Sequence, residues 1–230
     1  MNKLLEISIL PVLLTLFAFQ AGAFLQKKTK SPMCNPILVA VILVLLVLLV
    51  TGMDLEVYQA GNDFLSWLLT PATVCLAISM YEQFQILRKH IRVILVGVIA
   101  GAVSSLLMVL ALSLIFSFTP EMMISLLPKS VTTAIGVPLC ELAGGLPPIT
   151  TAVIILTGIV ASVLGPTLCK AFRLTNDIAQ GVAYGTAGHV IGTTKAMEQS
   201  KLAGAVSSLS LVVAGLVTAV VLPMIVSSIS

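Results

Sequence analysis

A lysine interrupts an otherwise apolar stretch of the chain and stands beside a proline and several hydroxyl residues. Proline has no backbone donor and breaks a helix, which leaves neighbouring carbonyl and amide groups without partners. An ammonium group, hydroxyls and free amides together suit an anion. The alternative is a solvated lysine in an outer loop, or one whose flexible stem carries the charge to water. The predicted anion-binding side chains are Lys129, Ser130, Thr132 and Thr133, with Pro128 as the helix break.

A second segment, from Gly181 to Lys195, combines glycines with threonines and a histidine. Its glycines are spaced four, three and four residues apart, which allows close helix packing or an unwound backbone beside a ligand. Packing alone does not explain the histidine, which titrates near neutral pH and can carry a proton, unless it is a hydrogen-bonded structural residue. The predicted site residues are Thr186, His189, Thr193 and Lys195 (the last alternatively a basic flank), with helix breaks at Gly185, Gly188 and Gly192.

The composition places both segments in a membrane protein. Of the 230 residues, 58% are hydrophobic and 9% are charged, whereas about a quarter of a soluble domain is charged. The mean hydropathy is +1.14, and a net charge of +3 is too small to indicate a nucleic-acid partner. These values exclude a cytosolic enzyme and a disordered chain. They predict one membrane domain over residues 1–230.

Recognisable catalytic and metal-binding motifs are absent from the sequence. Neither G-x-S-x-G, H-E-x-x-H nor a Walker pattern occurs, and the two histidines cannot build a conventional metal site alone. The four cysteines stand far apart without a C-x-x-C pair and resemble small apolar side chains. We therefore expect no enzymatic activity, no metal and no cofactor.

Stretches without charged residues predict about six membrane spans, because a helix needs about 20 apolar residues to cross the hydrocarbon core. The segments Met122–Gly145 and Ile178–Lys195 are too interrupted to be simple spans. The expected fold is all-α and polytopic, with these two as re-entrant or broken helical segments. The predicted spans are Ile7–Gln26, Ser31–Met53, Phe64–Tyr81, Val93–Pro120, Leu142–Cys169 and Leu202–Ser230.

Lysines and arginines orient these spans, because basic residues concentrate in cytoplasmic loops. The basic clusters at residues 27–30, 88–92 and 170–173 are assigned to the inside, and the acidic cluster at 54–63 to the outside. The first interrupted segment then begins and ends outside, and the second begins and ends inside. Broken helices that cross the membrane are the alternative. Ala21-Gly22-Ala23 resembles a signal cleavage site, but the basic cluster that follows favours an uncleaved span.

Two segments in the later part of the chain are weakly similar to each other and form a possible internal repeat. At an offset of 57 residues, Gly158 aligns with Gly215 and Pro166 with Pro223. Each unit is an interrupted segment followed by a full span, and the two would have opposite orientations, as in many transporters. Chance similarity between apolar sequences is the alternative. The units are Met122–Lys170 and Ile178–Pro223.

Two motifs are highly specific together: Pro-Lys-Ser-Val-Thr-Thr at 128–133 and Gly-Thr-Ala-Gly-His at 185–189. With them, the chain resembles the LrgB/CidB family of bacterial membrane proteins along nearly its whole length. Members usually carry proline, serine and arginine where this chain has Ala134, Gly188 and Lys195. Lysine for arginine keeps the charge but loses bidentate carboxylate binding. Further matching stretches are Asn35-Pro36, Leu69–Val74, Gly144–Pro147, Ile191–Thr193 and Gly204–Leu209.

The resemblance implies a multi-pass protein of the bacterial cell membrane with one of two functions. Bacterial members are described as holin-like or antiholin-like modulators of murein hydrolase activity and autolysis, acting with a small LrgA/CidA-type membrane protein. Relatives in plastids exchange glycolate and glycerate, and some bacterial relatives are linked to pyruvate. We expect a transporter or facilitator of small monocarboxylates, forming a homo-oligomer and working with an LrgA/CidA-like partner. The alternative is an antiholin-like modulator of autolysis.

Overall fold

The structure is a computed structural model that describes residues 2–29 and 36–229. These residues form helices and contain no strand, as expected for an all-α membrane protein. Lys30, in the first basic cluster, and Asn35, in the motif before the second span, lie outside the described residues. The helices group into two compact units, unit 1 (residues 1–75) and unit 2 (residues 76–230).

Unit 1 is built on two apolar helices and two short ones. Gly22 lets the first two helices approach closely, since a Cβ there would lie 2.6 Å from the carbonyl oxygen of Pro36. The third is tied to the first because Thr15 Oγ1 lies 2.6 Å from the Tyr58 hydroxyl. The bounds are α1 (Asn2–Thr29), α2 (Pro36–Thr51), α3 (Leu55–Gly61), α4 (Asp63–Trp67) and α5 (Leu69–Glu82), which continues into unit 2.

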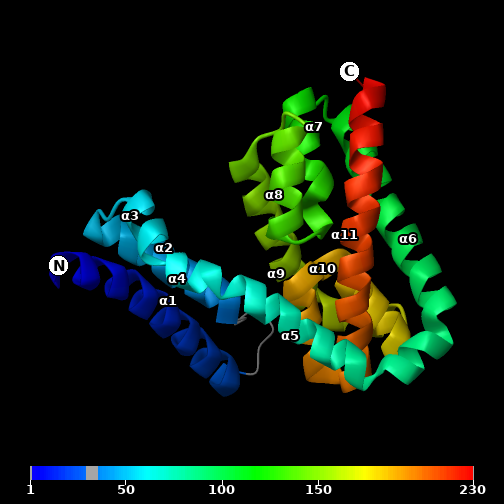
Figure 1. Ribbon diagram of the computed structural model, residues 1–230, viewed down its shortest axis with the longest axis horizontal. Coiled ribbons are helices and arrows are strands. Elements are labelled where there is room, and N and C mark those ends of the chain that lie inside the picture. Colours follow the sequence, from blue (N-terminus) through cyan, green and yellow to red (C-terminus); the bar gives the residue numbers. More distant parts are fainter. Residues whose placement is uncertain (1, 30–35, 230) are drawn as a thin grey trace. The chain divides into compact units, whose positions relative to one another are not determined.

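Unit 2 alternates long helices with two segments that fold back (Figure 1). The long helices are α6 (Phe84–Ile115), α9 (Pro147–Ala171) and α11 (Lys201–Ile229), and the intervening elements are α7 (Pro120–Leu126), η2 (Leu127–Ser130), α8 (Thr133–Leu142) and α10 (Asp177–Gln199). Helices α6 and α11 pack side by side through a shared apolar core. That core includes Ile94, Val98 and Val206, each with no exposed surface.

Four described helices are long and apolar enough to cross a membrane: α1, α6, α9 and α11. At the other two predicted positions the helices are shorter. Helix α2 has 16 residues, and the predicted span Phe64–Tyr81 is divided at Leu68 between α4 and α5. The division places Pro71 in the first turn of α5, where a missing N–H removes no helical hydrogen bond.

Helices α7, η2 and α8 form a hairpin, hairpin 1 (residues 120–142), that enters and leaves at the same end of unit 2. Ser125 in the entering limb accepts a hydrogen bond at Oγ from the Leu146 N–H, at 2.7 Å, just beyond the returning limb. Its carbonyl accepts another from Thr150 Oγ1, at 2.8 Å. The chain turns at Val131 and Thr132, which have extended backbone. The chain of hairpin 1 therefore folds back on itself, as a re-entrant segment would, and its re-entrant course through a membrane stays a prediction.

Helix α10 is also a hairpin, hairpin 2 (residues 177–199), because its helix breaks at His189, with φ 41° and ψ −134°. The returning limb lies against the entering one: a Cβ on Gly192 would be 2.5 Å from the Tyr184 carbonyl oxygen. Ser200 Oγ donates to Asp177 Oδ2 at 2.6 Å, which joins the two ends. Since α9 separates the hairpins, they enter from opposite ends of unit 2, as predicted.

The hairpins and long helices are related as the internal repeat suggests. Gly158 in α9 receives the tip of hairpin 2, where a Cβ would lie 2.6 Å from His189 Cε1. Its repeat partner Gly215 in α11 receives the tip of hairpin 1, where a Cβ would lie 2.7 Å from Ile135 Cδ1. The glycine at the corresponding position of each repeat therefore contacts the hairpin tip of the other repeat. This relation supports an inverted repeat.

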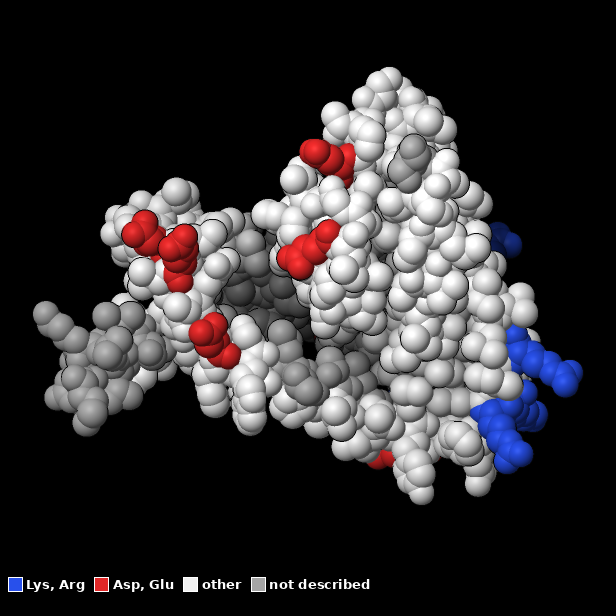
Figure 2. All heavy atoms as spheres, turned by 45° about the horizontal axis from the view of Figure 1, so that its top comes forward, with Lys and Arg blue, Asp and Glu red and all other residues white. Residues whose placement is uncertain are grey.

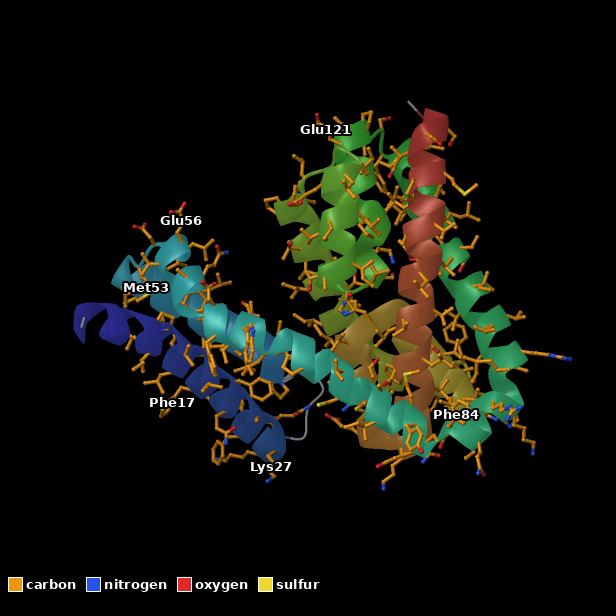
Figure 3. All side chains as sticks on the ribbon, viewed as in Figure 1. Phe17, Lys27, Met53, Glu56, Phe84 and Glu121 are labelled. Atoms are coloured by element: carbon orange, nitrogen blue, oxygen red, sulfur yellow. The ribbon has the colours of Figure 1, made fainter. Side chains whose placement is uncertain are left out.

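The two ends of unit 2 differ in charge. Among the described residues, the end where hairpin 1 enters carries Glu121 and Glu141 and no lysine or arginine, whereas the end near Phe84 carries the basic clusters 88–92 and 170–173 (Figure 3). The basic side chains visible in Figure 2 gather on one side of the surface. The positive-inside rule assigns the basic end to the cytoplasm.

Candidate functional site

Lys129 lies in η2, close to the tip of hairpin 1. Its Nζ donates to Oγ of Ser105 and to Oγ of Ser130, both at 3.0 Å. In the described part of the chain the one ion pair joins Lys195 to Glu198, so Lys129 has no carboxylate partner. Its charge is therefore met only by hydroxyl dipoles.

These three side chains hold more hydrogen-bond donors than acceptors. An ammonium has three hydrogens and each hydroxyl has one, while the acceptors are the two serine oxygens. The hydroxyls of Ser105 and Ser130 lie 3.1 Å apart, so one donates to the other. Together with the two bonds from Lys129, this leaves one ammonium hydrogen and one hydroxyl hydrogen without an acceptor among the described residues. Both hydrogens suit an oxygen acceptor, such as an oxygen-rich anion or water.

Ser105 is a residue that the sequence reasoning missed. It lies in α6, within a span that was treated as uniformly apolar. A helical pattern could have identified it, because Ala102, Leu106 and Val109 follow the same face and are buried. The hydroxyl of Ser105 on this stripe is bonded to Lys129 and to Ser130.

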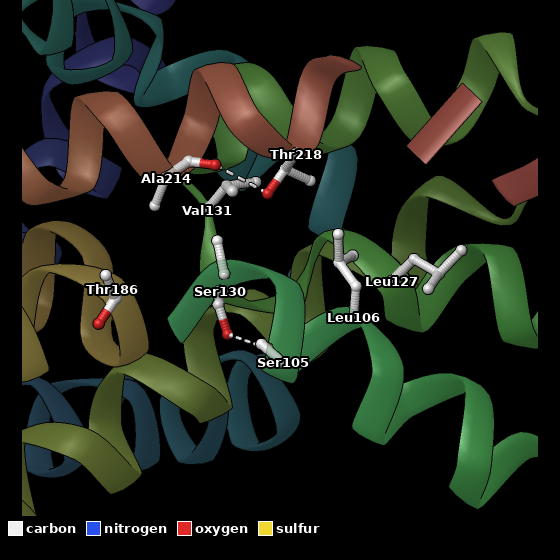
Figure 4. Close-up of a pocket in the computed structure, with 9 residues that line it drawn as sticks. Ser105, Leu106, Leu127, Ser130, Val131, Thr186, Ala214 and Thr218 are labelled. Carbon is white, nitrogen blue, oxygen red and sulfur yellow. Dashed lines mark hydrogen bonds between the residues drawn. The ribbon is translucent and has the colours of Figure 1, made fainter. Parts of the chain in front are cut away.

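A small cavity lies among the two hairpins, α6 and α11 (Figure 4). Its volume is about 10 Å³, roughly the space that one water molecule requires. Four hydroxyl residues line it, Ser105, Ser130, Thr186 and Thr218, among otherwise apolar walls. The cavity therefore brings together Ser130 and Thr186, two of the predicted site residues from different segments.

The other predicted residues of hairpin 1 shape its tip. Pro128 is buried and has non-helical angles, φ −83° and ψ 21°, at the predicted break. Thr132 is half-buried, and its carbonyl accepts from the amides of Ile135 and Gly136 at 3.0 and 2.8 Å. Thr133 is exposed and begins α8. Neither threonine lines the cavity; they set the start of α8, whose first amides have no acceptor within the helix.

His189 is 3% exposed, and its Nε2 lies 2.8 Å from the carbonyl oxygen of Ile154 in α9. A carbonyl only accepts, so Nε2 carries a hydrogen, and in the neutral ring Nδ1 is the acceptor. The histidine reaches this carbonyl because Gly158, one turn further along α9, has no side chain. It does not line the cavity.

Thr193 is fully buried and fastens hairpin 2 to α11. Its hydroxyl donates to the carbonyl of His189 at 2.8 Å and lies 2.8 Å from Ser207 Oγ. Lys195 instead pairs with Glu198 on the returning limb, away from the cavity, as its alternative role as a basic flank implies.

The glycines of hairpin 2 serve close packing, and the helix break falls on His189 instead of on them. A Cβ on Gly185 would lie 2.4 Å from the Ser207 carbonyl oxygen, and one on Gly188 would lie 2.7 Å from Ala161 Cβ. Gly192 meets the opposite limb in the same way. These contacts leave no room for any side chain, which accounts for the spacing.

The model of the LrgB-like family matches residues 15–228. This chain belongs to the LrgB-like family. Its sequence is 32% identical over 226 residues to the holin-like proteins CidB from two strains of Staphylococcus epidermidis. Each match covers 98% of this chain and 98% of the relative. No solved structure matches the sequence. The family match runs through both units and both hairpins, so Ser105, Lys129 and His189 all lie within it.

Proposed function

We propose that this LrgB-like protein carries small monocarboxylates such as pyruvate, glycolate or glycerate across the membrane, and that it is not an enzyme. One observation carries the proposal: near the tip of hairpin 1, the ammonium of Lys129 has two hydroxyl partners and no carboxylate partner among the described residues. An ionisable side chain at membrane depth costs at least about 2.5–3.5 kcal/mol, and it usually marks a functional site.

A carboxylate would complete the Lys129 cluster. It would accept the ammonium and hydroxyl hydrogens that lack an acceptor, and it would neutralise the charge of the half-buried Lys129. The start of α8 adds to the attraction, because the positive end of its dipole lies at the hairpin tip. Interrupted helices that point such ends at an anionic substrate are a recurring feature of transporters.

Transport also requires the site to open alternately to each side. A cavity of about 10 Å³ has room for a water molecule and not for a monocarboxylate. Either hairpin would have to withdraw from the cavity to admit substrate, and the two hairpins enter from opposite ends of unit 2. In this proposal, His189 would take up a coupling proton at Nδ1, because Nε2 is engaged with Ile154.

A holin-like or antiholin-like role in autolysis is the second candidate. The names of the CidB relatives support it more directly than they support transport. In this role the chain would self-associate or regulate a small LrgA/CidA-like membrane partner. It would form or control a non-selective lesion in the bacterial membrane. Such a lesion has no need of a hydroxyl-lined cation at a hairpin tip, although altered acid flux could influence lysis indirectly.

The test is uptake of labelled pyruvate, glycolate and glycerate into proteoliposomes, alone and with an LrgA/CidA-like partner. We expect saturable uptake that falls about 10-fold or more in Lys129→Ala, since a hydrogen bond to a charged group contributes about 1.5–3 kcal/mol. Lys201→Ala is the matched control, because it removes an exposed lysine at the start of α11. It should retain uptake.

Two results would contradict transport. The first is unchanged uptake in a folded Lys129→Ala protein. The second is equal leakage of the acids and of labelled sucrose, which would indicate a pore and favour the holin-like role. Dependence of all flux on the partner protein would indicate that the chain acts as a subunit of a larger assembly.

A further inference from the structure

An apolar groove opens at the basic end of unit 2, where α5 is followed by α6 at Phe84 (Figure 3). Its volume is about 370 Å³, within the range of about 300–1,000 Å³ that is usual for ligand sites. The residues that line it recur three and four positions apart, so they occupy one face of each helix. They include Ala77, Met80 and Tyr81 of α5, Leu87 and Arg88 of α6, and Leu209 of α11.

The floor of this groove is held in place by the core of unit 2. Leu87 is buried and belongs to the core that α6 and α11 share. Met80 and Leu209 are half-buried and pack against the same core. Leu209 lies about 12 Å from Lys201 along α11, at 1.5 Å per residue. The groove therefore extends from the basic end toward the apolar middle of the long helices.

Arg88 supplies the charge of the groove. Its side chain is exposed and forms no ion pair within the described part of the chain, not even with Glu82 at the end of α5. Tyr81 also lines the groove and is 81% exposed. A guanidinium and a phenol both donate hydrogen bonds, and the guanidinium matches the geometry of a phosphate. This end of the groove therefore suits an anionic phosphate, and the remainder suits hydrocarbon.

We propose that this groove binds one phospholipid with an anionic headgroup: an acyl chain occupies the groove, and the phosphate lies against Arg88. Charge complementarity favours this occupant, because the groove adjoins the basic cluster 88–92 and no acidic residue lines it. Anionic lipids of the inner leaflet attract basic segments at the ends of spans. The exposed rings of Tyr81 and Phe84 fit this level, because aromatic residues concentrate at membrane interfaces. The inference does not depend on the proposed transport.

The test is native mass spectrometry of the purified full-length protein in detergent, titrated with phosphatidylglycerol or with phosphatidylcholine of the same acyl chains. Phosphatidylcholine carries a cationic group beside its phosphate, so Arg88 should attract it less. We expect phosphatidylglycerol to bind at least about 5-fold more tightly, the factor that one basic side chain contributes near an anionic lipid surface. Arg88→Gln, which removes the charge and keeps a polar side chain, should abolish this preference.

Matched controls separate the groove from its surroundings. Lys170→Gln removes an exposed lysine at the same end of unit 2 but outside the groove, and it should retain the preference. Ala77→Phe adds a ring that would occupy the groove, so it should weaken binding of both lipids. Ala100→Phe adds the same ring at an exposed position of α6 that does not line the groove, and it should weaken neither.

Several results would overturn the inference. These are equal binding of the two lipids by the wild-type protein, and a preference that Arg88→Gln leaves unchanged. An equal loss in Lys170→Gln would assign the preference to the charge of the whole basic end. If Ala77→Phe changed the oligomeric mass in the same spectra and not lipid binding, a second copy of the chain would cover the groove instead. If Arg88→Gln does not fold, unchanged lipid binding in Ala77→Phe overturns the inference equally.

Discussion

At the scale of single residues, both hairpins contact Ile154 of α9, hairpin 1 through its side chain and hairpin 2 through its backbone carbonyl. Ile154 packs its side chain against Gly136 of hairpin 1, where a Cβ would lie 2.7 Å from Cδ1. Its carbonyl binds His189 of hairpin 2. Among the described residues Lys129 has hydroxyl partners alone, whereas His189 bonds to a backbone carbonyl.

Gly158→Ala should destabilise the protein by about 1–3 kcal/mol, as overpacking typically does. The new Cβ would lie 2.6 Å from His189 Cε1 and 2.8 Å from Ile191 Cδ1, so the hairpin tip must move away from α9. The measurement is the thermal unfolding midpoint in detergent. Gly101→Ala is the control, because its Cβ would meet Thr186 at an ordinary 3.4 Å.

The double variant Gly158→Ala/His189→Ala separates this clash from other effects of the added methyl group. Removing the imidazole should recover part of the stability lost in Gly158→Ala, which is the coupling expected of residues in contact. Simple additivity of the two losses would show that the glycine is not there to admit the histidine.

At the scale of elements, hairpin 2 depends on a helix that breaks at a residue other than glycine. His189 adopts a positive φ of 41°, a region that L residues rarely occupy and that costs of order 1–3 kcal/mol. Hydrogen bonds around the break offset this cost. The His189 imidazole bonds to the Ile154 carbonyl, and the His189 carbonyl accepts from Thr193. Ser200 donates to Asp177, which joins the two ends of the hairpin. The break is therefore a product of tertiary packing.

Gly192→Ala should destabilise hairpin 2 although alanine is the better helix former by about 1 kcal/mol. Its Cβ would lie 2.5 Å from the backbone oxygen of Tyr184, which cannot move without separating the limbs. We expect a net loss of about 1–3 kcal/mol in the same unfolding assay. Ala187→Gly, at an exposed position of the entering limb, measures the propensity effect alone. A Gly192→Ala protein that is more stable than wild type would mean that the limbs are not in contact.

At the scale of the whole molecule, the two ends of unit 2 differ in their charge and in the hairpin that enters there. The end where hairpin 1 enters has acidic residues and, among the described ones, no basic ones, and the end where hairpin 2 enters has the basic clusters. Although the hairpins enter from opposite ends, Val131 of hairpin 1 and Thr186 of hairpin 2 line the same cavity. The positive-inside rule then places hairpin 1 on the outer face and hairpin 2 on the cytoplasmic face.

Cysteine labelling of intact cells checks this arrangement in a variant whose four cysteines are replaced by alanine. A membrane-impermeant maleimide should label Glu121→Cys and Glu141→Cys from outside. It should label Arg173→Cys and Lys201→Cys only after permeabilisation. If Glu121→Cys and Glu141→Cys were labelled from opposite sides, hairpin 1 would cross the membrane and the re-entrant topology would be wrong.

The sequence by itself determined the environment, the fold class and the two segments that carry chemistry. A scarcity of charge forces the surface toward lipid, and an interrupted apolar segment with Lys129 or His189 cannot be an ordinary span. The basic clusters also favoured segments that turn back over broken helices that cross the membrane. These properties depend on composition and local order along the chain, so they can be read without a structure.

Only the tertiary structure decided which residues meet. Ser105 and Thr218 lie in apolar spans, and they become cavity residues because α6 and α11 pack around the hairpin tips. In the folded chain Lys195 pairs with Glu198 and does not line the cavity, and the helix break falls on His189 instead of on a glycine. Contacts between residues distant in sequence depend on helix rotation and crossing, which small residues such as Gly158 set in three dimensions and which periodicity alone does not encode.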